Sequence, residues 1–409
     1  MVAGRFRRRF ALLGHSRFRL LFFATFGSGF GSWLAVIALQ IDVYDRTRSG
    51  WWVGGLLIAN ILPAVFLGAL FGPLVDRLSR KGLMIASDLG RLGVFVALPF
   101  VGSAAAIVAL AAVAGVGNAF FRPAVLAGLP NLVAPGDLAG ANALIQLVEW
   151  TTTAAGPLAG GALVAASGPH LAYWVNAATF AFSALLVARI PGRLLQSDRP
   201  IGRGRWEDLA EGFAVVRRSR ALMCVLVAWS IVMVANGAVN VAEVFLAKQS
   251  YSSGDFGFGL LWAGSGIGLV AGGLAAASFI DRDLGSAYLR FLTVFAIGIG
   301  CAAAAPNVWV GAVAMIIAGF GNGGAVVANI TFVQRGAPDQ VRGRAFTLLI
   351  SANYAVLGVA FVICGPLTNA VGARWMYAGA AATILIAAGV ASRFVRGIAQ
   401  EFRQMASAT

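Results

Sequence analysis

Long apolar runs separated by short polar breaks set the pattern of the whole chain. Each run is long enough for a helix that crosses a bilayer, which needs roughly 20 residues. Helix breakers such as Gly50, Pro135 and Pro306 fall between the runs. Twelve runs can be traced, at about 18–43, 51–75, 82–102, 104–128, 138–167, 170–190, 220–247, 256–280, 287–304, 307–333, 342–370 and 372–393. The pattern therefore predicts an all-α membrane protein with twelve transmembrane helices.

The longest polar stretch, residues 191–219, divides the twelve runs into two sets of six. Apolar residues recur in it at helical spacing from Trp206 to Val216, which is typical of an amphipathic helix on the inner leaflet. We therefore expect three parts. These are a six-helix bundle in residues 1–190, a cytoplasmic linker with an amphipathic helix, and a second six-helix bundle in residues 220–409.

The two halves resemble each other in sequence. The pair Gly117-Asn118 in the fourth run has a counterpart in Gly321-Asn322 of the tenth run. Gly156-Pro157 in the fifth run likewise matches Gly365-Pro366 in the eleventh. Two similar halves around a site near the middle of the membrane are the architecture of many secondary transporters. We therefore expect two pseudo-symmetric bundles.

Composition supports a membrane protein and argues against other classes. The chain of 409 residues is 59% hydrophobic and 11% charged, whereas soluble domains average about 45–50% and about 25%. The net charge of +15 could indicate a nucleic-acid partner. However, 25 of the 31 Lys and Arg residues lie on the side of the termini, and four lie in the opposite loops. This bias predicts cytoplasmic termini and no nucleic-acid partner.

A short charged stretch joins the second and third runs. It reads Gly72-Pro-Leu-Val-Asp76-Arg77-Leu-Ser-Arg80-Lys81. The spacing resembles the cytoplasmic loop signature of the major facilitator superfamily, between its second and third helices. The resemblance implies a gating loop, defined here as Gly72, Asp76, Arg77, Arg80 and Lys81, which braces the cytoplasmic side. The alternative is that these charges only anchor the helices at the inner leaflet.

The fifth run contains Gly156-Pro157-Leu-Ala-Gly160-Gly161. Proline removes a helix hydrogen bond and bends the helix, and the glycines allow a close helix–helix contact. The stretch resembles the antiporter motif of exporters in the same superfamily, although Thr152 stands where that motif usually has a further glycine. Together with Phe121-Arg-Pro-Ala124, it resembles drug:proton antiporters of the secretion-effector group. The alternative is a packing kink without a role in transport direction.

Glu149 is the main candidate for proton coupling or substrate binding. It lies near the middle of the fifth run, where charged residues are costly and usually functional. Gln146 and Thr153 share its helix face. A carboxyl group there could exchange protons near neutral pH or pair with a cationic substrate. The alternative is a neutral Glu149 that is hydrogen-bonded to a neighbouring helix.

Further polar groups lie within the apolar runs. Asp88, Arg91 and Arg122 fall at similar depths, and we expect them to form one ionic cluster with Asp76. A structural or gating role is favoured for this cluster, and substrate binding is the alternative. In the seventh run, Asn236, Asn240 and Glu243 share one helix face. They either join Glu149 in lining a cavity for substrate and protons or bridge neighbouring helices.

These observations favour a secondary active transporter that exports a small amphiphilic molecule, such as a drug, siderophore or other secondary metabolite. Export would be driven by proton antiport with alternating access. The alternatives are a proton-coupled importer or symporter, and a non-transporting membrane sensor or scaffold. The sequence contains no nucleotide-binding loop, catalytic triad or metal-ligand pattern, so we expect neither an enzyme nor a cofactor or metal. Its partners would be the substrate, protons and the lipids of a bacterial inner membrane, where we expect a monomer.

Overall fold

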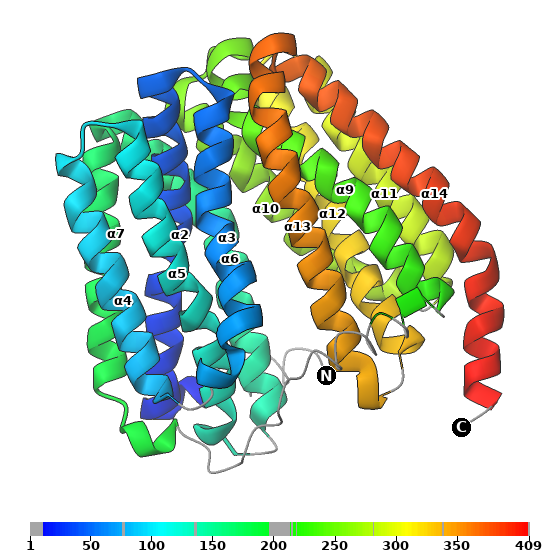
Figure 1. Ribbon diagram of the computed structural model, residues 1–409, viewed down its shortest axis with the longest axis horizontal. Helices are drawn as coiled ribbons and strands as arrows, with labels where there is room; N and C mark the ends of the chain where they lie inside the picture. Colours follow the sequence, from blue (N-terminus) through cyan, green and yellow to red (C-terminus); the bar gives the residue numbers. More distant parts are fainter. Residues whose placement is uncertain are drawn as a thin grey trace. The chain divides into compact units, whose positions relative to one another are not determined.

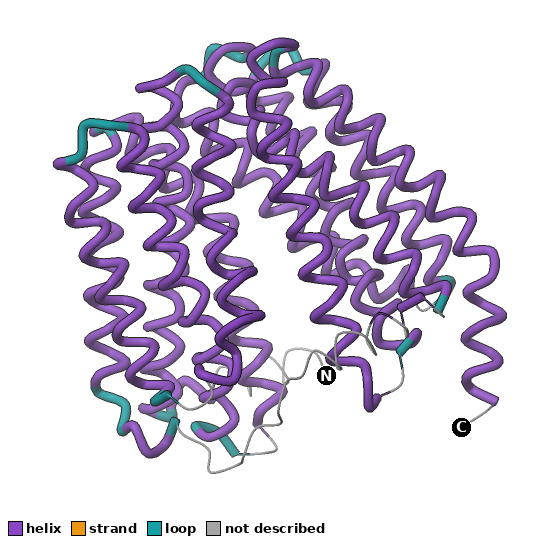
Figure 2. The backbone as a smooth tube through the Cα atoms, in the orientation of Figure 1, coloured by secondary structure: helices purple, strands orange, loops and turns teal. Residues whose placement is uncertain are grey.

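The computed structural model is built from long α-helices. Figure 2 shows no strand in the described part of the chain. The structure describes the backbone of residues 11–75, 78–134, 137–195, 213, 216–217, 219–280, 282–337 and 339–407. The twelve long helices in these residues are α2 (Ser16–Thr47), α3 (Gly50–Val75), α4 (Arg80–Ala97), α5 (Ala104–Gly128), α6 (Leu138–Ser167), α7 (Pro169–Ala188), α9 (Arg220–Phe245), α10 (Gly254–Ile280), α11 (Leu284–Ala304), α12 (Val308–Gly336), α13 (Asp339–Val371) and α14 (Ala373–Ser407). The predicted all-helical class is confirmed.

Ten of these helices, within the described residues, are long and apolar enough to cross a membrane. The described apolar part of α3 is shorter and covers Gly50–Pro63. The helix α6 is not among the ten, and it carries Gln146, Glu149 and three consecutive threonines. The candidate site on α6 therefore lies on a helix that is not among these ten.

Local sequence accounts for where several helices begin. Ser79 and Ser103 accept hydrogen bonds from backbone N–H groups in the first turns of α4 and α5, both at 3.2 Å. Asn307 does the same for α12 at 3.1 Å, and Asp283 for α11 at 3.0 Å. Such N-caps satisfy backbone donors that have no partner within the helix. The Ser286 hydroxyl also donates to Asp283 and lowers the pKa of that carboxyl group.

The chain forms two compact units with the same packing pattern. Unit 1 comprises Met1–Arg48 and Leu56–Arg203, and unit 2 comprises Ser49–Gly55 and Gly204–Thr409. In unit 1, α2 packs on α6 and α7, while α4 packs on α5 and α7 (Figure 1). In unit 2, α9 packs on α13 and α14, while α11 packs on α12 and α14. The internal repeat read from the sequence thus corresponds to a repeated helix arrangement.

The expected three-part division stays a prediction. Most of the linker, including Trp206 and Leu209, lies outside the described residues. Asp76 and Arg77 of the gating loop do so as well. Gly72 lies in α3, but its surroundings are outside the described part of the structure.

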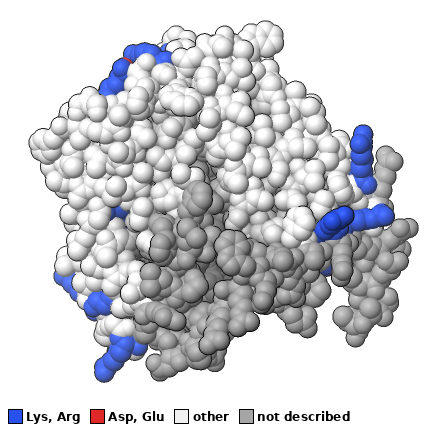
Figure 3. Space-filling view, viewed as in Figure 1, with Lys and Arg blue, Asp and Glu red and all other residues white. Residues whose placement is uncertain are grey.

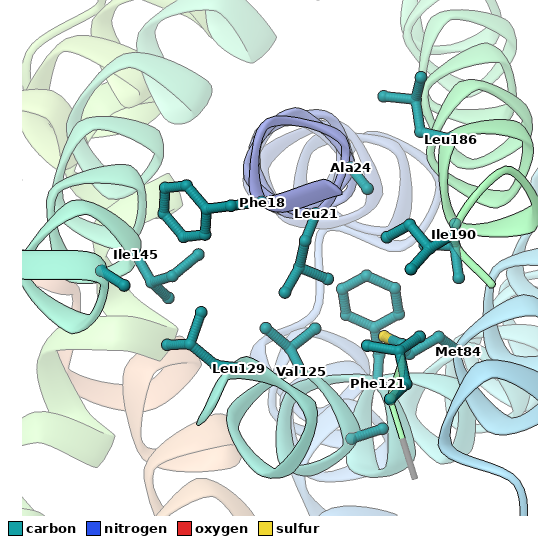
Figure 4. Packing of buried hydrophobic residues seen from close by; sticks show 14 of the residues in the cluster. Phe18, Leu21, Ala24, Met84, Phe121, Val125, Leu129, Ile145, Leu186 and Ile190 are labelled. Atoms are coloured by element: carbon teal, nitrogen blue, oxygen red, sulfur yellow. The ribbon is translucent and has the colours of Figure 1, made fainter. Parts of the chain in front are cut away.

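One end of unit 1 is closed by a tightly packed apolar cluster. Figure 4 shows Leu21 of α2 facing Val125 of α5 and Phe18 of α2 next to Ile145 of α6, with Met84 of α4 beside Phe121. Helix–helix association in lipid depends on such close packing because lipid tails are as apolar as the side chains themselves. The cluster therefore fixes how α5 is rotated about its axis.

The glycines of the predicted antiporter motif bring α6 against α2. A Cβ atom at Gly156 would lie only 2.6 Å from Cβ of Trp33, and one at Gly160 only 2.7 Å from the Leu34 carbonyl oxygen. Pro157 and Gly161 are buried in the same helix. Side chains larger than hydrogen are thus excluded at Gly156 and Gly160 unless the two helices move apart.

Charged side chains lie mainly at the helix ends. On the face drawn in Figure 3, the Lys and Arg side chains lie mostly near the ends of the helices, and most of the surface between them carries no charge. A charge-free belt is what the hydrocarbon core of a bilayer, about 30 Å thick, requires. Charged residues located within the helices, away from their ends, therefore deserve a functional explanation.

Candidate functional site

An ion pair between α5 and α6 forms the candidate site in unit 1. The Arg122 Nε lies 2.9 Å from Glu149 Oε1, and the Arg122 Nη2 donates to Glu149 Oε2 at 2.9 Å. Gln146 Nε2 also donates to Glu149 Oε2, at 3.2 Å. Bidentate arginine–carboxylate pairs of this kind fix both partners in direction as well as charge. The site thus holds one carboxylate with a guanidinium and an amide directed toward it.

Both side chains of this pair are at least partly exposed. The side chain of Arg122 is 65% exposed and that of Glu149 is 27% exposed. Glu149 lies eleven residues into α6, which is about 16 Å along the helix axis and near the middle of a bilayer. An exposed charge at that depth is costly in lipid. We therefore infer that this face of unit 1 meets water and not hydrocarbon.

Neighbouring residues explain the direction of Arg122. Phe121 points into the apolar cluster and is buried. The next residue is turned by about 100° around the helix, so Arg122 points away from the cluster. Pro123 follows directly inside α5, and its missing N–H weakens the helix at this point. The local sequence therefore holds the guanidinium outside the core.

Two threonines support Glu149 through its backbone. The Thr153 hydroxyl donates to the Glu149 carbonyl oxygen at 2.7 Å. The buried Thr152 hydroxyl contacts the carbonyl oxygens of Val148 and Glu149, at 2.9 and 3.1 Å. Although Thr153 shares the helix face of Glu149, its hydroxyl thus donates to the main chain and not to the carboxylate. Of the predicted partners on this helix face, only Gln146 hydrogen-bonds to the carboxylate.

Among the described residues, the expected cluster of Asp88, Arg91 and Arg122 is divided between two ion pairs. Asp88 Oδ1 accepts from Arg91 Nη2 at 2.6 Å, and both side chains are buried. Arg91 also lies over the rings of Phe121 and Phe180, at 4.9 and 4.3 Å from their centroids. Phe121 thus covers Arg91, while the following Arg122 turns to Glu149. The physical reason for the separation is this one-residue step on α5.

The described cations of the gating loop bind helix ends. Arg80 Nη1 donates to the carbonyl oxygens of Ala127 and Leu195, at 2.8 and 2.9 Å. Lys81 Nζ donates to the carbonyl oxygen of Ala188 at 2.6 Å. Ala127 and Ala188 lie in the last turns of α5 and α7, where unpaired carbonyls and the helix dipole favour positive charge. These residues tie the start of α4 to two neighbouring helices.

The polar face of α9 belongs to unit 2. Asn240 Nδ2 donates to the Asn236 carbonyl oxygen at 2.7 Å, so this amide is used within its own helix. Glu243 is only 3% exposed, and its Oε1 has no hydrogen-bond partner. The predicted grouping of these residues with Glu149 in one cavity stays a prediction.

A second buried acid in unit 1 was missed from the sequence. Asp42 accepts from Arg46 Nε at 2.6 Å and from the Tyr173 hydroxyl at 2.8 Å. Arg46 also donates to the Gly102 carbonyl oxygen at 3.0 Å. The sequence did contain a signal for this cluster, because Asp42 lies near the end of an apolar run and Arg46 follows one helical turn later. The cluster joins α2, α7 and the connection before α5.

Comparison with known proteins gives the same family over most of the chain. Residues 21–360 match the sequence model of the Major Facilitator Superfamily. The multidrug efflux pump Tap of Mycolicibacterium fortuitum is 25% identical over 371 residues, which cover 86% of this chain and 89% of the relative. The uncharacterized MFS-type transporter YfiS of Bacillus subtilis (strain 168) is 24% identical over 374 residues, covering 84% and 89%.

A solved structure shares the fold. The crystal structure of the nucleoside transporter NupG superposes with a TM-score of 0.71 at 15% sequence identity. The superposition covers 92% of this chain and 98% of that one. At this identity the similarity concerns the fold alone.

Proposed function

The chain belongs to the Major Facilitator Superfamily, and from this premise we propose that it exports a small amphiphilic molecule in exchange for protons. The observation that supports the proposal is the partly exposed Glu149 carboxylate, which is paired with Arg122 and hydrogen-bonded by Gln146 in unit 1. A transporter of this family is a multi-pass membrane protein and not an enzyme. The direction, the driving ion and the substrate class are the parts that we propose.

The Arg122–Glu149 pair suggests how a proton and a substrate exclude each other. The carboxylate accepts from one bidentate guanidinium in the present arrangement. A proton on Glu149 removes its charge and weakens the pair, and a cationic group of a substrate competes for the same oxygens. Because proton and cation cannot both neutralise Glu149, each must leave before the other binds, which is the requirement for antiport. Arg122 serves as the counter-ion of the empty site.

The substrate is proposed to combine an apolar body with a cationic or hydrogen-bond-donating group. The site offers few polar groups, namely Arg122, Glu149 and Gln146, and binding sites commonly fix orientation with a small number of polar contacts. Drugs and other secondary metabolites fit this description. The relative Tap, which is described as a multidrug efflux pump, supports this class.

Export is supported by the antiporter motif on α6 and by the same relative. An importer or symporter is the second candidate, and the exposure of Arg122 favours it specifically. If protonation of Glu149 releases the guanidinium, an anionic substrate could take its place, so that proton and substrate would travel together. The sign of the substrate charge therefore separates the two mechanisms.

We further propose a bacterial cytoplasmic membrane as the location and the cytoplasmic side for both termini. The bias of Lys and Arg toward the loops on the side of the termini supports this topology. A monomer with the division into residues 1–190, 191–219 and 220–409 completes the proposal.

Transport into everted vesicles tests the function. An imposed pH gradient should drive uptake of cationic amphiphilic dyes by the wild type. Glu149→Gln should abolish the gradient-driven uptake, whereas Asp45→Asn, which removes an exposed acid paired with Arg48 at 3.6 Å, should not change it. Proton-driven uptake that survives in Glu149→Gln refutes the role of Glu149. If the wild type moves no compound of a cationic and anionic panel under a gradient, a non-transporting sensor is favoured instead.

A further inference from the structure

Glu243 differs from the other buried acids in the described residues. Asp42 and Asp88 each have an arginine and a hydroxyl group as partners. Glu243 has no ion pair with a described residue, and its Oε1 accepts no hydrogen bond. An ionised carboxylate without partners is strongly disfavoured inside a helix bundle in a membrane. In this arrangement the side chain is therefore stable only as a neutral acid that carries its proton.

Glu243 lies directly before an irregular turn. The helix α9 ends at Phe245 and continues as a π-helix, η6 (Leu246–Ser250). The Leu246 N–H is shared between the carbonyl oxygens of Ala242 and Glu243. Short π-helical segments inside helices are frequent at functional sites because they break the regular hydrogen-bond ladder. The acid thus lies where α9 can change its local pairing at low cost.

Tyrosines, and not cations, surround this acid. The Tyr377 hydroxyl of α14 is fully buried without a hydrogen-bond partner, and it interacts electrostatically with Glu243. Tyr251, which follows η6, also interacts with Glu243, and burial raises the pKa of its phenol to about 12. The Tyr251 hydroxyl donates to the Ala302 carbonyl oxygen. These phenols offer hydrogen-bonding groups but no charge at neutral pH.

The cations near this acid are committed to other partners. Arg374 of α14 donates to the Ala303 carbonyl oxygen at 2.9 Å and lies 5.5 Å from the Tyr251 ring centroid. Lys248 of η6 lies 2.5 Å from Asp255 of α10. Two further helices pack against α9. On α13 the buried ionisable group is Cys364, and the described residues of α12 include no buried ionisable group. Within the described residues, no cation therefore forms an ion pair with Glu243.

We propose that Glu243 is a second proton-binding site, which carries a proton through unit 2 independently of Glu149. In the present arrangement the O–H bond of the carboxylic acid is intact. When water enters beside η6, that bond breaks, the proton passes to water, and the carboxylate retains the electron pair. This inference rests on the proposed antiport. It adds one proton per cycle to the proton that Glu149 exchanges for substrate.

The extra proton has an electrical consequence. If Glu149 exchanges one proton for one monovalent cation, that exchange moves no net charge. A second proton carried by Glu243 makes the same cycle move one positive charge inward. Export of a monovalent cation should therefore respond to the membrane potential as well as to the pH gradient.

Infrared difference spectroscopy tests the protonation of Glu243 without any transport assay. The full-length protein in lipid nanodiscs should show the carbonyl stretch of a protonated carboxyl group at neutral pH. We expect Glu243→Gln to remove this band, Glu243→Asp to shift it, and Glu149→Gln to keep it. Thermal unfolding of each variant checks that it is folded. A band that persists unchanged in Glu243→Gln overturns the proposal, whether or not the protein proves to be an antiporter.

Vesicles with separately imposed gradients test the role of the proton. With a monovalent cationic dye, the wild type and Asp45→Asn should respond to both the potential and the pH gradient. Glu243→Gln should keep its response to the pH gradient and lose its response to the potential, because it moves one proton fewer per substrate. Equal sensitivity to the potential in Glu243→Gln and wild type overturns the proposal. Loss of all transport in Glu149→Gln alone would leave the infrared result to decide on Glu243.

Discussion

At the scale of single residues, the buried pair of Asp88 and Arg91 contrasts with the open pair of Arg122 and Glu149. Both side chains of the buried pair are nearly inaccessible, and Ser28 and two phenylalanine rings surround them. Such a pair contributes little net stability, but removal of one partner leaves an uncompensated buried charge. We therefore propose a structural role for this pair and a functional role for the exposed pair of Arg122 and Glu149.

Asp88→Asn should strongly destabilise unit 1. Arg91 would lose its only carboxylate partner among the described residues, and the expected loss is about 3–5 kcal/mol. Thermal unfolding in detergent should show a large drop for this variant. Asp45→Asn, at an exposed pair worth about 0–1 kcal/mol, provides the control. Replacement of both partners, by Asp88→Asn with Arg91→Met, should recover part of the loss. Equal unfolding temperatures for Asp88→Asn and Asp45→Asn would contradict the assignment.

The sequence predicted part of the candidate site at this scale. The spacing of Gln146 and Glu149 placed them on one face of a helix, and the structure shows their hydrogen bond. The partner of Arg122 was not predictable, because it depends on how α5 is rotated about its axis. Packing of Phe121 in a cluster of five helices sets that rotation. Contacts between distant segments of the chain decide this rotation, and the spacing of residues along one helix does not reveal such contacts.

At the scale of helices, apolar runs located the elements well, and their ends less well. The last run ends near residue 393, whereas α14 continues to Ser407. Charged and polar residues interrupt the apolar run there but remain good helix formers, so the helix extends beyond it. The π-helix η6 had no signal in the apolar pattern. It changes the hydrogen-bond ladder and leaves the side-chain pattern intact.

The contact between α6 and α2 should be sensitive to side-chain size. Gly156→Leu would place atoms where the Trp33 side chain already lies, and overpacking of this kind costs about 1–3 kcal/mol. We expect a lower unfolding temperature and impaired transport, with a smaller effect for Gly156→Ala. Gly93→Leu on α4 is a matched control, because a Cβ atom at Gly93 would meet no atom within 4 Å. A Gly156→Leu variant as stable and active as the control would contradict a packing role for the antiporter motif.

At the scale of the whole molecule, the two units repeat the fold but not the chemistry. The Gly156-Pro157 pair on α6 matches the Gly365-Pro366 pair on α13. Gly358 precedes its pair by the same separation as Glu149 precedes its own, so Gly358 is the position equivalent to Glu149. Unit 2 instead carries its buried acid on α9, at Glu243. A duplicated scaffold has thus placed one open and one closed carboxyl group in different helices. In the proposed transport cycle, this asymmetry gives the two acids separate roles.

The topology of the whole chain can be tested by cysteine labelling. Single cysteines would be introduced into a variant without the native cysteines. Gly102→Cys and Pro306→Cys lie in exposed connections that we place outside the cell. Arg193→Cys and Arg282→Cys lie in exposed connections that we place in the cytoplasm. A membrane-impermeant maleimide should label the first two in intact cells and the last two only after lysis. The reason is that the loops rich in Lys and Arg are retained on the cytoplasmic side. Labelling of Arg193→Cys or Arg282→Cys in intact cells would reverse the orientation. It would also place the cations Arg80 and Lys81, and the gating loop to which they belong, on the outer side of the membrane.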